Sequence, residues 1–127
     1  MELGRNMNLT ISTKQIGDVS IFALKGRILL GEESNSLRER LKSLICDGKK
    51  IVLNMANVTY IDSTGLGILV SAHVSAQKQG TALHLSDLGR KFHDLLQLTR
   101  LLTVFSVYAT EAEAMSSFGV LAQAAVA

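Results

Sequence analysis

Two short runs near the start of the chain have strand-like patterns: apolar and polar positions alternate in the first, and the second is mostly apolar. The first run holds Leu9 and Ile11 with polar residues between them, and the second is Val19–Leu24. Gly17 and Asp18 separate the two runs, and a Gly-Asp pair in this position is typical of a tight hairpin turn. The pattern therefore predicts an antiparallel hairpin at the N-terminal end of the fold.

After the hairpin, apolar residues recur at the spacing of an amphipathic helix. Ser36 and Glu39 have capping-box spacing, so we expect the helix to open there and to end before Gly48. Its apolar positions recur on one helical face: Leu37, Leu41, Leu44 and Ile45.

The middle of the chain repeats this order of strand and helix. Lys50–Met55 is an apolar run of strand length, and we expect Ala56–Asp62 to continue it as an irregular exit. A second helix is predicted from Thr64 to Gln79, with Gly80 as its C-terminal stop.

The last third alternates in the same way. Thr110 and Glu113 form a second capping box, which opens a helix running through Phe118. Strands alternating with helices predict an α/β fold with a mixed, mostly parallel sheet of about five strands, about four helices and an N-terminal antiparallel hairpin. Before the last helix, the pattern predicts a strand, a helix and a strand at Thr81–Leu85, Arg90–Thr99 and Val104–Tyr108.

Composition narrows the class of protein. The 127 residues suit one compact domain, and 47% hydrophobic with 19% charged residues is a balance typical of a folded core. The net charge of +2 comes from scattered basic residues, and only 5% of residues are aromatic, so nucleic acid is not an expected partner.

The cysteine count and the hydropathy pattern bear on location. Cys46 is the only cysteine, which excludes an intramolecular disulfide and a multi-cysteine zinc site. We interpret it as an inert packing residue near the apolar face of the first helix. No signal peptide and no run of about 20 apolar residues are present, so we expect a cytoplasmic chain without direct membrane insertion.

The most informative stretch is DSTGLG, which lies between an apolar strand and a helix. The carboxyl end of a strand in an α/β sheet is where binding sites concentrate. Ser63 or Thr64 can cap the helix, whose N-terminus carries unpaired N–H groups and a positive dipole end. The residues of the stretch are Asp62, Ser63, Thr64, Gly65, Leu66 and Gly67.

The two glycines of this stretch leave two interpretations open. Gly65 and Gly67 each cost about 1 kcal/mol relative to alanine in a helix interior. Missing side chains would let a partner surface approach the backbone closely and leave the serine hydroxyl exposed. The alternative is a plain helix cap followed by tolerated glycines, and the physics alone favours neither.

Catalytic and cofactor chemistry have little support. A nucleophilic Ser63 needs a base, but His73 stands ten positions along the same helix, roughly 15 Å away. Val70 replaces the third glycine of a dinucleotide fingerprint, and no phosphate-loop lysine follows. We interpret His84 as structural and His93 as a surface residue, and we expect no catalytic residue, no metal site and no cofactor.

Two further groups of residues have simple interpretations. Met115 and Phe118 stand three positions apart and are expected to contact the core. Arg90, Lys91 and Arg100 could rim a partner surface, although an ordinary solvated face is the interpretation we prefer.

The sequence resembles the STAS-domain family of bacterial anti-sigma factor antagonists. The resemblance is carried by the Asp62–Gly67 motif, by LKGRI at Leu24–Ile28 and by the longer run Lys49–Gly67. It extends over residues 9–118, which leaves 1–8 as a flexible N-terminal segment and 119–127 as a tail or helix extension. Many members carry an acidic residue near the position of Leu29, so partner contacts from that loop are expected to differ.

The resemblance implies partner switching. The unmodified domain would bind an anti-sigma factor serine kinase and thereby regulate sigma-factor-dependent transcription. The kinase would phosphorylate Ser63 and so release the chain, and a PP2C-type phosphatase would restore it. The partner-binding residues would be those of the motif, Asp62 to Gly67. STAS domains also serve as regulatory subunits of membrane transport complexes without phosphorylation, and this alternative remains open.

Overall fold

A computed structural model of the chain describes residues 9–118. It contains a five-stranded sheet in the order β1-β2-β3-β4-β5. Strands β1 and β2 are antiparallel, and the three remaining pairs of neighbours are parallel. The predicted fold class is confirmed. The strands are β1 (Leu9–Ile16), β2 (Val19–Ile28), β3 (Lys50–Ile61), β4 (Leu83–Ser86) and β5 (Ser106–Tyr108). The helices are α2 (Glu32–Cys46), α3 (Ser63–Lys78), α4 (Arg90–Leu98) and α5 (Glu111–Ser116).

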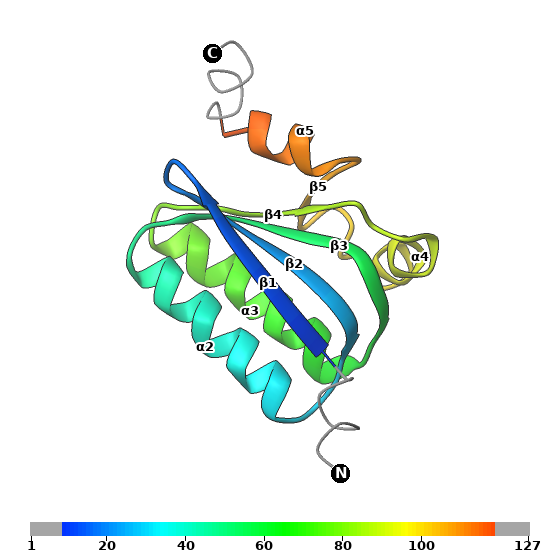
Figure 1. The fold of residues 1–127 in the computed structure, drawn as a ribbon. Coiled ribbons are helices and arrows are strands. Elements are labelled where there is room, and N and C mark those ends of the chain that lie inside the picture. Colours follow the sequence, from blue (N-terminus) through cyan, green and yellow to red (C-terminus); the bar gives the residue numbers. More distant parts are fainter. Residues whose placement is uncertain (1–8, 119–127) are drawn as a thin grey trace.

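The sheet has a hydrophobic core on each face. Helices α2 and α3 lie side by side along one face, and α5 lies across the other (Figure 1). Because successive strand residues point to opposite faces, Leu53 packs in the larger core under α2 and α3 while Val52 packs under α5. Met115 is buried in the smaller core and Phe118 packs against it, as the sequence predicts.

The N-terminal hairpin forms as predicted. Ile16 pairs with Val19, so Gly17 and Asp18 make a two-residue turn. Gly17 has a φ of 62°, a conformation that glycine adopts without a steric penalty.

Strand β3 is longer than the sequence predicts. Ala56–Ile61 is part of the strand rather than an exit from it, because it pairs with the second half of β2. The pairing passes through two register shifts, one between Ala23 and Lys25 and the other between Gly26 and Arg27. Such shifts break the alternation of apolar and polar residues, which explains why the pattern fails here. The extension carries β3 directly into the DSTGLG stretch.

The predicted capping box of the first helix is wrong. Helix α2 begins at Glu32, so Ser36 lies inside it, and its N-cap residue Gly31 makes no side-chain cap bond. Glu32 and Glu33 place negative charge in the first turn, where the helix dipole favours it. At the other end, Cys46 is exposed and is not the packing residue that we expected.

The remaining boundaries agree to within a few residues. Strand β4 begins later than predicted, because the backbone N–H of Thr81 donates to the Ala76 oxygen at the end of α3, at 2.9 Å, and is not available to the sheet. The predicted cap of the last helix forms, with Thr110 Oγ1 accepting from the backbone N–H of Glu113 at 3.1 Å. The expectations for residues 1–8 and 119–127 lie outside the described residues.

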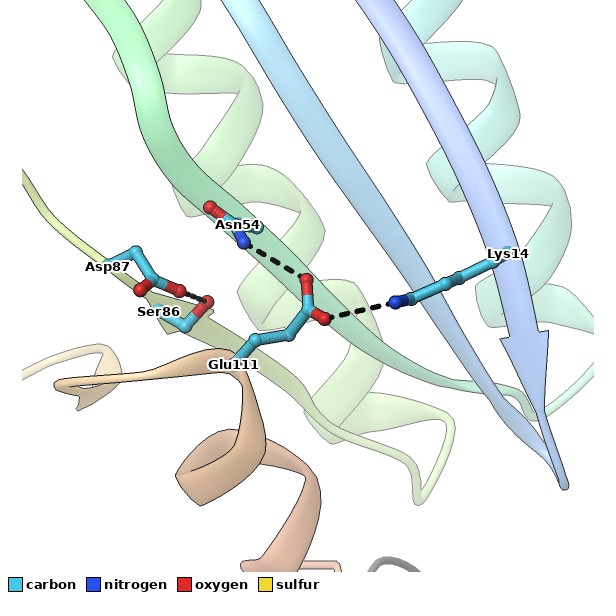
Figure 2. A network of polar contacts seen from close by, with 5 residues as sticks. All are labelled: Lys14, Asn54, Ser86, Asp87 and Glu111. Atoms are coloured by element: carbon cyan, nitrogen blue, oxygen red, sulfur yellow. Dashed lines mark hydrogen bonds and ion pairs between the residues drawn. The ribbon is translucent and has the colours of Figure 1, made fainter.

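A polar network fastens α5 to the sheet (Figure 2). The Glu111 carboxylate accepts a hydrogen bond from Asn54 Nδ2 of β3 at 3.0 Å and lies 3.3 Å from Lys14 Nζ of β1. At the end of β4, the buried Ser86 hydroxyl donates to Asp87 Oδ2 at 2.8 Å. The two contacts of Glu111 tie α5 to β3 and β1 and so hold it over the smaller core, on the face of the sheet opposite to α2 and α3.

Candidate functional site

Asp62 joins two segments at the end of β3. It is the N-cap residue of α3, and its Oδ1 accepts from the backbone N–H of Gly65 at 2.8 Å. Its Oδ2 accepts from the backbone N–H of Leu30, in the loop between β2 and α2, at 3.0 Å. The expectation that Ser63 or Thr64 caps the helix is therefore wrong. A carboxylate has two oxygens, so it caps α3 and holds the neighbouring loop together, which a single hydroxyl oxygen cannot do as well.

These contacts also fix the charge of Asp62. The N–H groups of Gly65 and then of Leu30 stabilise the carboxylate and hold the pKa of Asp62 below its usual value, against a smaller opposing effect of desolvation. Asp62 is thus ionised at neutral pH. The start of α3 therefore carries a negative charge immediately before Ser63.

Ser63 is the first residue of α3 and is exposed. Its hydroxyl has no hydrogen-bond partner among residues 9–118. Because Asp62 performs the capping, the Ser63 hydroxyl is left free at the surface. Thr64 and Leu66 beside it are half-buried, so Ser63 is the more accessible hydroxyl of the pair.

The two glycines of the motif lie in different surroundings. A Cβ at Gly65 would stand 2.4 Å from the backbone oxygen of Ile28 and 2.7 Å from Ile61 Cγ1, so Gly65 permits α3 to pack against β2 and β3. The expectation that Gly65 serves the close approach of a partner is wrong, because the chain itself occupies that space. A Cβ at Gly67 would meet no atom within 4 Å, and Gly67 is exposed.

Two large apolar side chains lie exposed close to this stretch. Leu30, whose backbone binds Asp62, is 76% exposed, and Tyr60, near the end of β3, is 59% exposed. Sequence reasoning missed both. The Ile28-Leu29-Leu30 run held part of the signal, because Ile28 is fully buried and leaves Leu30 to project from the loop that follows.

The three histidines are held in structural or surface positions. His73 is buried with its ring 5.4 Å from that of Phe105. His84 Nδ1 lies 2.8 Å from the Ser117 hydroxyl, and its ring stacks on Phe118 at 4.2 Å between centroids. Burial lowers the pKa of His84, which favours its neutral form. No histidine contacts Ser63 within residues 9–118, so no described histidine is in position to act as its base.

Within residues 9–118 no group of three or more His, Cys, Asp and Glu side chains is placed to hold a metal ion. None of the helices in that range is long and apolar enough to cross a membrane.

Comparisons with known proteins agree with one another. The STAS domain family model matches residues 10–114. The anti-sigma-B factor antagonist of Bacillus subtilis (strain 168) is 30% identical over 103 residues, which covers 81% of this chain and 94% of that protein. The anti-sigma F factor antagonist of Paenibacillus polymyxa is 27% identical over 119 residues, covering 91% and 99%. A crystal structure of the Thermotoga maritima protein tm1081 matches with a TM-score of 0.76 and 25% identity, covering 84% and 92%.

Proposed function

The chain belongs to the STAS domain family, and from this premise we propose that it is an anti-sigma factor antagonist switched by phosphorylation of Ser63. In its unmodified form it binds an anti-sigma factor serine kinase, which leaves the sigma factor free. Phosphorylation of Ser63 by that kinase releases the chain. Two relatives named as anti-sigma factor antagonists, each matched over nearly its full length, support the choice of partner.

One observation carries the proposal: Ser63 is an exposed, unbonded hydroxyl at the start of α3, between the ionised Asp62 and the open Gly67. A kinase needs a hydroxyl that it can reach without unfolding its substrate. A serine that capped its own helix would lose that bond on modification. Here the cap belongs to Asp62, so Ser63 is modified without loss of the cap.

Electrostatics supplies the switch. Phosphorylation adds about −1.5 to −2 charges at pH 7. The dipole at the N-terminus of α3 accommodates a negative charge locally, typically by 0.3 to 1 kcal/mol, so the fold is retained. The phosphate on Ser63 also adds bulk and a second negative charge beside Asp62. Both weaken the binding of a partner whose surface fits the unmodified motif. The motif residues from Asp62 to Gly67 are the proposed contact surface.

The chain itself is then a binder and a substrate rather than an enzyme. The kinase binds ATP and transfers a phosphate from it to Ser63. A PP2C-type phosphatase removes this phosphate and restores binding. Both partners act in the cytoplasm, where we place this chain.

Titration calorimetry with the anti-sigma factor kinase of the source organism tests the proposal. Wild type and Ser63→Ala are expected to bind with similar affinity, because the hydroxyl makes no hydrogen bond among the described residues. Ser63→Glu is expected to bind at least a hundredfold more weakly, which corresponds to about 2.8 kcal/mol. All three should melt within a few degrees of one another, because a charge at the N-terminus of α3 changes stability by at most about 1 kcal/mol. Equal binding by Ser63→Glu would contradict the switch, and selective binding to a membrane transport protein without phosphorylation would favour the other role known for STAS domains.

A further inference from the structure

A groove opens between the C-terminal half of β3 and helix α4, and we call it the β3–α4 groove. It has a volume of about 380 Å³. Its floor is formed by two buried apolar side chains, Ile61 and Phe92, which are 8% and 6% exposed. Half-buried Val58 and Leu95 form its sides, and Tyr60 and Lys91 stand exposed at its rim.

The groove is continuous with the surface around Ser63. The strand that forms one wall ends at Ile61, and Asp62 and Ser63 follow directly. Tyr60 therefore lies about 10 Å from Ser63 along an extended chain with a rise of about 3.3 Å per residue. An ordinary interface of about 800 Å² per partner is wide enough to cover Ser63 and to reach Tyr60 at the edge of this groove as well.

Among the described residues that line the groove, Lys91 is the one that carries a charge. Lys91 is exposed and makes no ion pair with any described residue, and Arg90 beside it is also exposed. The groove is lined by no acidic side chain in the part of the chain that the structure describes. An apolar floor with a free cation at its edge is complementary to an apolar side chain that has a carboxylate nearby.

We propose that the β3–α4 groove is a second contact surface for the anti-sigma factor kinase and that it receives an apolar side chain flanked by an acidic residue. The apolar side chain fills the groove against Ile61 and Phe92, with Tyr60 closing over it, and the acidic residue pairs with Lys91. This inference rests on the proposed function. It assigns Arg90 and Lys91 to a partner surface, the interpretation that the sequence left as the less favoured one.

The groove and the switch have separate tasks. Phosphorylation changes the charge at Ser63 and leaves the groove unaltered, so the groove contributes affinity and choice of partner in the unmodified state. As a substrate of the kinase, a groove variant would dock poorly but would present an intact Ser63. Its KM should rise while its kcat stays near that of wild type.

Two variants and two matched controls test the groove. Tyr60→Ala removes the exposed aromatic rim, and Lys91→Glu reverses the rim charge in the first turn of α4, where a glutamate suits the helix dipole. Leu98→Ala truncates an 82% exposed apolar residue on the same helix outside the groove, and Lys42→Glu makes the same charge change on α2. Thermal denaturation of every variant checks that the fold is retained.

The measurements are affinity for the kinase by calorimetry and KM for phosphorylation of Ser63. Both groove variants should bind at least tenfold more weakly than wild type, with KM raised to match, and both controls should stay within twofold. High salt should weaken binding of wild type but change that of Lys91→Glu less, because the ion pair is already lost. Wild-type affinity in both groove variants, with wild type itself bound and phosphorylated, would overturn the groove alone. Failure of the wild-type chain to bind any anti-sigma factor kinase would overturn the proposed function and the groove with it.

Discussion

Gly65 and Gly67 differ in what surrounds them, although they stand two positions apart in one motif. Gly65→Ala would place a Cβ against the backbone oxygen of Ile28, which cannot move aside as a side chain can. We expect a loss of about 1 to 3 kcal/mol, typical of overpacking, measured by urea denaturation. An unchanged unfolding midpoint would show that α3 does not pack against β2 as closely as described.

Gly67→Ala is expected to separate stability from binding. The new methyl group meets no atom within 4 Å, and alanine is the better helix former by up to about 1 kcal/mol, so the variant should be more stable. If the partner docks over this backbone, the same methyl group should weaken its binding. Urea denaturation and calorimetry on one preparation measure both effects. A variant that gains stability and binds as wild type does would exclude close approach at Gly67.

The lowered pKa of Asp62 predicts a pH dependence of stability. Because the pKa in the folded state lies below the unfolded value of 3.8, the unfolded chain binds the proton more readily. The contribution of Asp62 is therefore complete well above pH 3.8 and is lost as the pH falls through the folded value. Asp62→Asn should show a weaker acid dependence than wild type in urea denaturation followed from neutral to acidic pH.

Asp18 provides the matched comparison for that experiment. Its pKa is also lowered, first by the hydrogen bond from Lys50 at 3.1 Å, and it lies in the hairpin turn away from α3. Asp18→Asn should reduce the acid dependence in the same direction without affecting partner binding. If Asp62→Asn leaves the acid dependence unchanged, the two N–H contacts of its carboxylate are not maintained in solution.

At the scale of elements, the short helix α5 depends on its N-terminal contacts. Thr110 Oγ1 accepts from the Glu113 N–H, and the six-residue helix has few hydrogen bonds of its own. Thr110→Ala should cost about 1 kcal/mol of unfolding free energy, within the usual range for an N-cap. Thr110→Ser keeps the acceptor and should lose little. Equal stability of the alanine and serine variants would show that this cap contributes nothing.

Two capping boxes with the same spacing had opposite outcomes, and the difference shows what local patterns can predict. Thr110 and Glu113 follow a strand and a loop, so the cap coincides with the start of the helix. Ser36 and Glu39 fall inside α2, since the chain turns earlier, at Gly31 with a φ of 153°. Both capping patterns predicted a helix correctly. The residue at which each helix begins depended on where the preceding chain turns.

For the whole molecule, the fold followed from the alternation of strand and helix, because each run was long enough to show its period. The DSTGLG stretch also lies where the sequence predicts, between the end of β3 and the start of α3. What the sequence could not predict were contacts between distant segments: Asp62 with Leu30, Gly65 with Ile28, and the groove between β3 and α4. The first two depend on how β2 lies against β3, including register shifts that no local pattern encodes, and the groove depends on where α4 packs.

The central claim is that Ser63 is the acceptor of the phosphate that switches this molecule. The most direct measurement is phosphosite mapping by mass spectrometry after incubation of the intact chain with the anti-sigma factor kinase and ATP, with Ser63→Ala and Thr64→Ala treated in parallel. The account predicts one phosphate, located on Ser63, present in wild type and in Thr64→Ala and absent from Ser63→Ala. A phosphate on Thr64 or elsewhere, or undiminished phosphorylation of Ser63→Ala, would contradict it.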